Sequence, residues 1–360
     1  MGLSIKDIKS KIKRFLVENA SLVVLFVLCV VFLFIDSSLF SVRNIRNILS
    51  ITAPRLIVAC AFAFCLYLGI LNISLAFFAG LAGIFAASFF QTPNSTSVVF
   101  SSFPSIPVSV VVIVVILVMC LVSLLHVLLI RTFSFSFILS NLGIIALLYG
   151  FAHVYLHNSE KGLIYLDAFS VSFRKIATAS IGSDPTYSLP VSVIVSVFIC
   201  IGLWIARFRI SALKTLFNQK PQSNMHDSNE KMPLFELVLV LFISTAVASF
   251  GGIMQVSYTG YVDSEFGLNY LFDIIVICLI SGFSIFGGKG RLPFLIIGSF
   301  VYTAFCYTVD YVGLERYIPS IIIRAVVIII CIITDIYFYQ CKAKQVEINS
   351  MVNKKIETEY

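Results

Sequence analysis

Charged residues are scarce in this chain, and their scarcity sets the class of protein. Aspartate, glutamate, lysine and arginine make up 12% of its 360 residues, whereas soluble proteins carry about a quarter. Hydrophobic residues make up 59% and the mean hydropathy is +1.01. These values exclude an ordinary soluble domain and predict an all-α integral membrane protein folded as one bundle. The net charge of +7 needs no nucleic-acid partner, because membrane proteins concentrate lysine and arginine in cytoplasmic loops.

Motifs for catalysis and metal binding are also lacking. The nine cysteines include no CxxC pair, which is typical of small buried hydrophobic residues. His153 and His157 are spaced i, i+4 but have no third ligand nearby, so interfacial polar residues are favoured over a metal site. The turn at 287–290 falls short of a phosphate loop, because Gly282 stands one residue too far upstream and Gly290 replaces the metal-binding hydroxyl. We therefore expect no catalytic residue, metal or cofactor, and no ATP hydrolysis by this chain itself.

What the chain does contain is a series of ten apolar runs, most of them long enough to cross a hydrocarbon core of about 30 Å. They lie at about 20–35, 51–71, 74–90, 107–129, 135–156, 188–206, 234–253, 269–287, 292–309 and 318–339. A basic amphipathic segment at 1–19 precedes the first run, and no cleavage site follows it, which indicates an uncleaved anchor. The 74–90 run is short and begins at a polar break, which predicts a partial or tilted helix. We predict a transmembrane domain at 20–340 and a tail at 341–360.

The distribution of positive charge indicates the orientation of these runs. If the N-terminus is cytoplasmic, ten crossings place 17 lysines and arginines inside and six outside. This split favours about ten transmembrane helices with both termini in the cytoplasm. Two loops are long. The outside loop at 157–187 could hold a short helix or cap the bundle, and the inside loop at 207–233 is either a docking site for a soluble partner or a solvated connector.

Polar residues within the apolar runs are the remaining candidates for function. A charge at membrane depth is costly, so it pairs or faces a water-filled path. Asp273 lies in the eighth run, and an ion pair with Arg55 or Arg324 near the outer face is our hypothesis. Asn72 and Asn141 are polar positions of the same kind. Contact between helices is at least as good an explanation for any one of these residues.

Four stretches of sequence carry a more specific signal. The first stretch is 44–49 leading to 68–75, which reads LGILNISL, and the second is 135–143, which reads FSFILSNLG. The third is 270–290, which contains YLFDII, then SG and then SIFGGKG, and the fourth is 318–335. In this order and spacing, over roughly 20–340, they resemble the membrane permeases of bacterial ABC importers for simple sugars, the ribose/galactose/xylose type. Residues 55–59 and Gln91 are most similar to the members that carry galactose and methyl galactosides.

The resemblance implies a permease that moves a sugar across the bacterial inner membrane without changing it chemically. It implies a pathway between two permease subunits, a cytoplasmic ATPase and an extracytoplasmic sugar-binding protein. The implied substrate is like galactose, glucose or a methyl galactoside; nucleosides or ribose-like solutes are the alternative, and a secondary transporter is a more distant one. The residues expected to line the substrate pathway are Asn72, Ser74, Phe137, Asn141, Asp273 and Ser281.

The sequence departs from this family at three places, one of which is Phe78, in the area of a small residue. Asn72 stands where the family has an aspartate. The family's inside loop also carries a coupling helix rich in alanine and glycine, which presses into the ATPase, whereas Pro221 would interrupt a helix here. The expected ATPase-coupling residues are Leu216, Phe217, Asn218, Gln219 and Lys220. Either coupling uses altered contacts, or a different permease subunit docks the ATPase, or the function has diverged.

Overall fold

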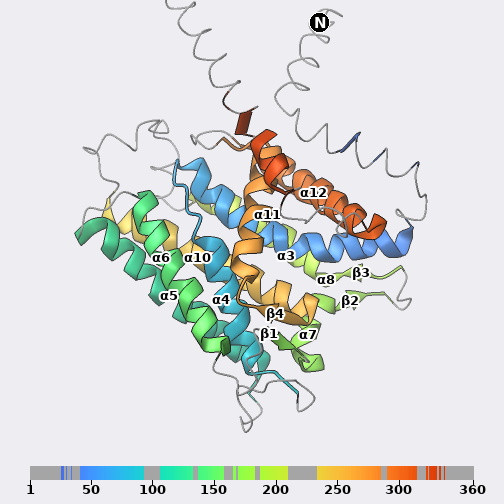
Figure 1. Ribbon diagram of the computed structural model, residues 1–360, viewed down its shortest axis with the longest axis horizontal. Helices are drawn as coiled ribbons and strands as arrows, with labels where there is room; N and C mark the ends of the chain where they lie inside the picture. The colour runs from blue at the N-terminus through green and yellow to red at the C-terminus, as the bar shows by residue number, and fades with distance from the viewer. Residues whose placement is uncertain are drawn as a thin grey trace, which may run out of the picture.

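The structure is a computed structural model of helices packed side by side, with two small sheets at one end (Figure 1). It describes residues 41–92, 106–132, 137–157, 165–167, 169–182, 187–209, 233–284, 290–313, 324–330 and isolated helical positions at 26–34 and 322–336. The helices are α3 Val42–Tyr67, α4 Leu75–Ser88, α5 Val108–Thr132, α6 Phe137–His157, α7 Val171–Thr178, α8 Val191–Arg209, α10 Leu234–Thr259, α11 Phe266–Ile280 and α12 Leu292–Val312. The strands are β1 Tyr165–Asp167, β2 Ser180–Ile181, β3 Leu189–Pro190 and β4 Tyr261–Asp263. We call the helical segment 324–330 the closing helix.

Five of these helices are long and apolar enough to cross a membrane, namely α3, α5, α6, α10 and α12. This confirms the predicted class, an all-α protein with several membrane spans. The number of ten spans and the cytoplasmic position of both termini stay predictions. Most of the first predicted run and much of the last lie outside the described residues.

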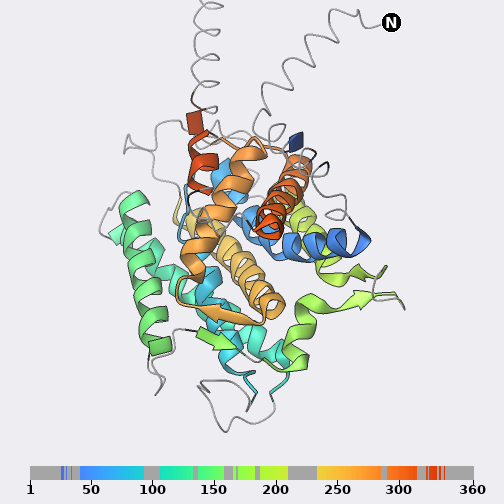
Figure 2. The ribbon, with the colours of Figure 1, turned by 45° about the vertical axis from the view of Figure 1, so that its right-hand side comes forward.

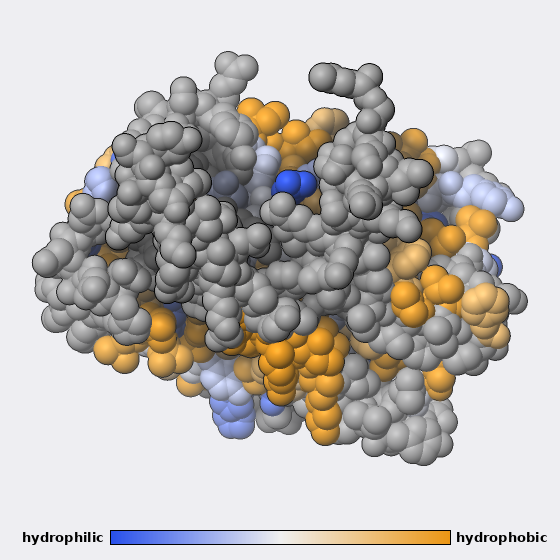
Figure 3. Space-filling model, turned by 90° about the horizontal axis from the view of Figure 1, so that it is seen from above, coloured by the Kyte–Doolittle hydropathy of each residue, from blue (hydrophilic) through white to orange (hydrophobic). Residues whose placement is uncertain are grey.

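The helices at the centre of the bundle differ from those at its edge. In α3, 83% of the most apolar stretch is buried, against 28% in α5 and in α6. Large apolar side chains such as Ile113, Leu121 and Phe151 are exposed on α5 and α6, and α6 stands at the edge of the molecule (Figure 2). The view from above likewise shows hydrophobic side chains exposed around the rim (Figure 3). We infer that this edge faces lipid, where exposed apolar surface costs nothing.

Two helix boundaries correct the sequence prediction. α3 begins at Val42, nine residues before the predicted run, and the side chain of Ser41 accepts a hydrogen bond from the backbone N–H of Asn44 at its start. Arg43 and Arg46, which precede the predicted run in the sequence, therefore lie in the first turns of a helix. α11 ends at Ile280 instead of 287, because Gly282 takes the left-handed φ of 77°.

The predicted partial helix is confirmed in α4, which has 14 residues. The chain leaves α3 at Tyr67 and crosses a break at 68–74, where Gly69 has a φ of 79°. α4 then packs along α10 so closely that a Cβ on Gly252 would collide with the carbonyl group of Ala79. The break is thus held inside the bundle by helices on either side of it.

The loop at 157–187, which the sequence predicts to face outside, contains a short helix, α7, as that prediction allows. Its neighbours are two antiparallel strand pairs, β1 with β4 and β2 with β3 (Figure 1). The hydroxyl of Ser257 in α10 donates to the carbonyl of Phe173 in α7 at 2.8 Å. We infer that these elements form a cap joined to the ends of the membrane helices.

Candidate functional site

The carboxylate of Asp273 on α11 is the centre of a buried, charged site. Asp273 is 3% exposed. Its Oδ2 lies 3.2 Å from an Nη of Arg55 on α3, and its Oδ1 lies 3.4 Å from Nε of Arg324 on the closing helix. The hydroxyl of Tyr302 on α12 donates to Oδ1 at 2.8 Å. The hypothesis of an ion pair with Arg55 or Arg324 is confirmed, and both arginines share the one acid.

These four residues, which we call the charged cluster, tie together α3, α11, α12 and the closing helix. Two guanidinium groups face one carboxylate, so the cluster carries one excess positive charge. Within the described part of the chain, Nε of Arg55 and the hydroxyl of Tyr270 are buried without a hydrogen-bond partner. A buried polar group without a partner costs free energy. The site therefore has unused hydrogen-bonding capacity at membrane depth.

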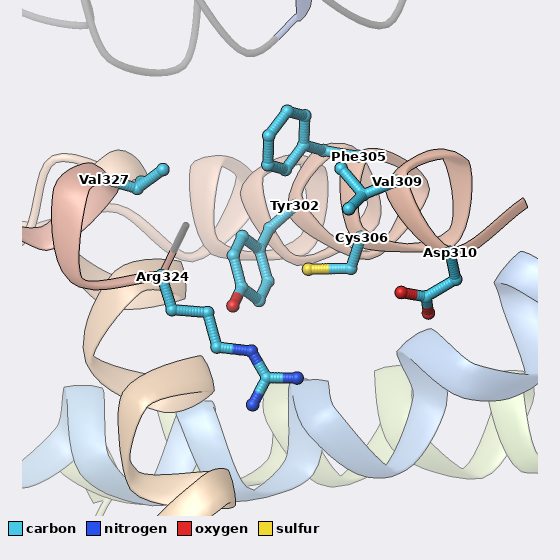
Figure 4. Close-up of a pocket in the computed structure, with 7 residues that line it drawn as sticks. All are labelled: Tyr302, Phe305, Cys306, Val309, Asp310, Arg324 and Val327. Atoms are coloured by element: carbon cyan, nitrogen blue, oxygen red, sulfur yellow. The ribbon is translucent and has the colours of Figure 1, made fainter. Parts of the chain in front are cut away.

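A pocket opens beside the charged cluster, between α12 and the closing helix (Figure 4). Its lining residues are Tyr302, Phe305, Cys306, Val309, Asp310, Arg324 and Val327. Arg324 and Tyr302 belong to both the pocket and the cluster. The pocket has a volume of about 20 Å³, which is enough for about one water molecule beside the buried charges.

Three of the predicted pathway residues meet at the break between α3 and α4. The hydroxyl of Ser74 donates to Oδ1 of Asn72 at 2.7 Å, and the Ser74 N–H donates to Oδ1 of Asn141 at 3.2 Å. Nδ2 of Asn141 donates to the carbonyls of Leu71 and Phe137 at 3.0 and 2.9 Å. Asn141 thus satisfies backbone groups that the break removes from helical bonding.

The other predicted residues are placed differently. The carbonyl of Phe137 accepts a hydrogen bond from Asn141 one turn further along α6, and the centroid of the Phe137 ring lies 5.0 Å from that of His126. Ser281 lies two helical turns beyond Asp273, where its side chain packs against Gly298 of α12. Close packing of α11 on α12 is enough to explain a serine at position 281. The expected coupling residues Leu216, Phe217, Asn218, Gln219 and Lys220 lie outside the described residues.

No group of three or more potential metal ligands occurs among the residues that the structure describes. The rings of His153 and His157 stack with centroids 6.1 Å apart. Nδ1 of His153 lies 3.4 Å from the hydroxyl of Ser264. The pair therefore packs as rings at the end of α6 next to β4.

The α12 side of the site does not follow from the pattern of charges in the sequence. Tyr302, Cys306 and Asp310 recur every four residues, which places them on one face of a helix. That spacing was available in the sequence. The spacing does not by itself predict a site, because tyrosine and cysteine are ordinary residues in membrane helices.

Comparison with known proteins bears on the class. Residues 235–331 match the family model described as branched-chain amino acid transport system / permease component. The chain is 23% identical to the galactose/methyl galactoside import permease protein MglC of Escherichia coli over 89% of this chain and 94% of that protein. It is 25% identical to MglC of Haemophilus influenzae, over 93% and 98% of the two chains. It is 24% identical to the ribose import permease protein RbsC of Haemophilus influenzae, over 91% and 95%. No solved structure matches it significantly.

The fold and these similarities define a multi-pass membrane permease. More particularly, the resemblance to the permeases of bacterial ABC importers for simple sugars, first found in four motifs, is confirmed by relatives that extend along about nine-tenths of the chain. The chain is therefore a protein of the bacterial cytoplasmic membrane.

Proposed function

We propose that this chain is the permease subunit of an ATP-driven importer for a simple sugar of the galactose type. The observation that carries the proposal is the similarity to import permeases for galactose and methyl galactosides along about nine-tenths of the chain. The chain is not itself an enzyme in this proposal, and the sugar leaves it chemically unchanged. The near miss to a phosphate loop at 287–290 agrees with an energy source on another chain.

The proposed partners are a cytoplasmic ATPase, an extracytoplasmic sugar-binding protein and a second permease subunit, identical or different. The ATPase meets the inside loop at 207–233, through residues such as Phe217 and Lys220. The binding protein meets the outer cap around α7 and β1–β4. The 1–19 segment lies on the membrane surface and the 341–360 tail lies in the cytoplasm. Binding and hydrolysis of ATP then shift the permease between two accessible states, which requires a difference in contacts between them.

The proposed pathway passes the residues that the sequence predicted, namely Asn72, Ser74, Phe137, Asn141, Asp273 and Ser281. Asp273 has the strongest support, because charged side chains at membrane depth usually face a polar path. Asn72 and Asn141 have the next strongest support, because they lie at the break between α3 and α4 and breaks in membrane helices often mark binding sites. Support for Ser281 is weakest, since it packs against Gly298.

The test is co-purification of the permease with the ATPase and the binding protein from the same genetic locus. We expect sugar-loaded binding protein to stimulate ATP hydrolysis by the assembly, and ligand-free binding protein to stimulate it less. Galactose and ribose are compared, because ribose import permeases are also among the relatives. Stimulation by ribose alone would move the substrate to the ribose class. Absence of any complex with the ATPase would contradict the proposal.

A further inference from the structure

The antiparallel strands β2 and β3, which we call the outer strand pair, have one buried and one exposed face. Ile181 and Leu189 are directly opposed, so their side chains point to the same face. Ile181 is 62% exposed and Leu189 is 46% exposed. Tyr187, two residues before Leu189, is 74% exposed, whereas Ser188 between them is 4% exposed, as the alternation of side chains along a strand requires. The outer strand pair therefore presents apolar and aromatic side chains away from the bundle.

The contacts of the outer strand pair place it level with the ends of apolar helices. Nε of Arg46, in the second turn of α3, donates to the carbonyl of Ser188 at 3.1 Å. The neighbouring Asn44 accepts a hydrogen bond at 2.9 Å from the hydroxyl of Tyr307, which lies near the end of α12. α8 begins directly after β3. Because α3 and α12 are long enough to cross a membrane, this level corresponds to the boundary between the headgroups and the acyl chains.

The helix that follows the outer strand pair exposes an apolar stripe. Phe198, Ile201 and Ile205 of α8 are exposed, and their spacing of three and four residues places them on one face of the helix. Such a face on a membrane helix contacts lipid. Charge is almost absent from the preceding sequence, because Asp184 is the one charged residue in 180–190. Tyrosine is enriched where a membrane meets water, so Tyr187 also fits this depth.

We propose that the outer strand pair is a membrane anchor, with the side chains of Ile181, Tyr187 and Leu189 inserted into the outer leaflet. The occupant of the exposed face is phospholipid. Because Arg46 joins the strand pair to α3, the anchor fixes the height of α3 and α8 in the membrane. The rest of the cap, formed by α7, β1 and β4, stays available to the binding protein. This inference does not depend on which solute the permease carries.

Tryptophan fluorescence tests the anchor, because the chain has one native tryptophan, Trp204. Trp204→Phe removes the native signal, and Ile181→Trp is introduced into that variant. The full-length permease is placed in nanodiscs of phosphatidylcholine that carries bromine either near the headgroup or near the chain ends. An interfacial segment reaches about 5–10 Å into the boundary between headgroups and acyl chains. We therefore expect the shallow bromine to quench the fluorescence of Ile181→Trp several-fold more than the deep bromine does.

The matched control is Glu265→Trp, made in the same Trp204→Phe background. Glu265 is an exposed residue of the outer cap, next to β4, and a carboxylate that is exposed avoids lipid. Tryptophan at this position should be quenched by iodide in the water and hardly at all by brominated lipid. Leu189→Trp gives a second reading at the depth of Ile181 and should repeat its pattern, which decides the question if Ile181→Trp does not fold.

Three results would overturn the anchor. If iodide quenches Ile181→Trp and Leu189→Trp as strongly as Glu265→Trp, and brominated lipid does not, the face lies in water. If neither quencher reaches these positions, a protein surface such as a second copy of the chain covers the face. If iodide is excluded only after the binding protein is added, the face is a docking surface for that protein. Quenching by shallow bromine without any partner present is the result that supports the anchor.

Discussion

At the scale of single residues, one buried acid holds the charged cluster together. Asp273 is the acceptor for two arginines and one tyrosine, and each partner comes from a different helix. Removing one member of a buried ion pair is costly, because it leaves the other charge uncompensated in a poorly solvated place. The members of the charged cluster are therefore unequal. The acid is needed by both arginines, whereas each arginine has a substitute in the other.

This inequality predicts the order of three variants. Asp273→Asn should lower the stability of the purified protein by about 3 to 5 kcal/mol, since Arg55 and Arg324 lose their counter-charge. Arg55→Gln should lower the stability by a smaller amount, because Arg324 and Tyr302 still contact the carboxylate. The double variant should recover part of the loss, because a single excess positive charge remains instead of two. Thermal unfolding in detergent measures the order of stability. If the double variant is destabilised as much as Asp273→Asn, the pairing is wrong.

At the scale of the elements, close contact between helices fixes the break in the chain. α4 starts after the break at 68–74 and then packs along α10, where Gly252 of α10 lies against the backbone of Ala79. Only a glycine permits this approach, because any side chain would collide with a carbonyl group that belongs to a helix. Polar contacts from Asn141 hold the other side of the break.

A pair of glycine substitutions tests this contact. Gly252→Ala should reduce stability by about 3 kcal/mol, as overpacking of a tight core does, and lower the yield of folded protein. Gly202→Ala in α8 is the matched control, since no atom lies within 4 Å of its added Cβ and alanine is the better helix former. The unfolding temperatures of both variants are compared with the parent. Equal tolerance at the two positions would contradict the packing of α4 on α10.

The sequence predicted helices better than it predicted where they end. The α4 run was recognised as short because Asn72 and Ser74 interrupt the apolar pattern, and the structure agrees. The start of α3 was missed because Arg43 and Arg46 look like loop residues, although Ser41 caps a helix before them. The ion pair could be predicted since opposite charges in apolar runs need partners. The pocket could not be predicted from the sequence, because ordinary residues line it. It forms only where packing brings α12 and the closing helix together.

At the scale of the whole molecule, the charge distribution makes a prediction about topology. With 17 lysines and arginines assigned to the cytoplasm and six to the outside, the loop at 157–187 should face outward and the loop at 207–233 inward. Single cysteines introduced into each loop of a cysteine-free variant report their side by labelling with a membrane-impermeant reagent in intact cells. Labelling of 207–233 from outside would reverse the orientation. The proposed docking of an ATPase on that loop would then fail.

We propose that this permease is driven by ATP hydrolysis on a separate cytoplasmic chain. It is tested most directly by uptake of labelled galactose into proteoliposomes that contain the permease, the ATPase and the sugar-loaded binding protein. The control assembly carries an ATPase whose phosphate-loop lysine is replaced by alanine. We expect uptake to require ATP and to fall to background in the control assembly. Uptake that continues unchanged in the control assembly, or without any ATPase, would contradict it.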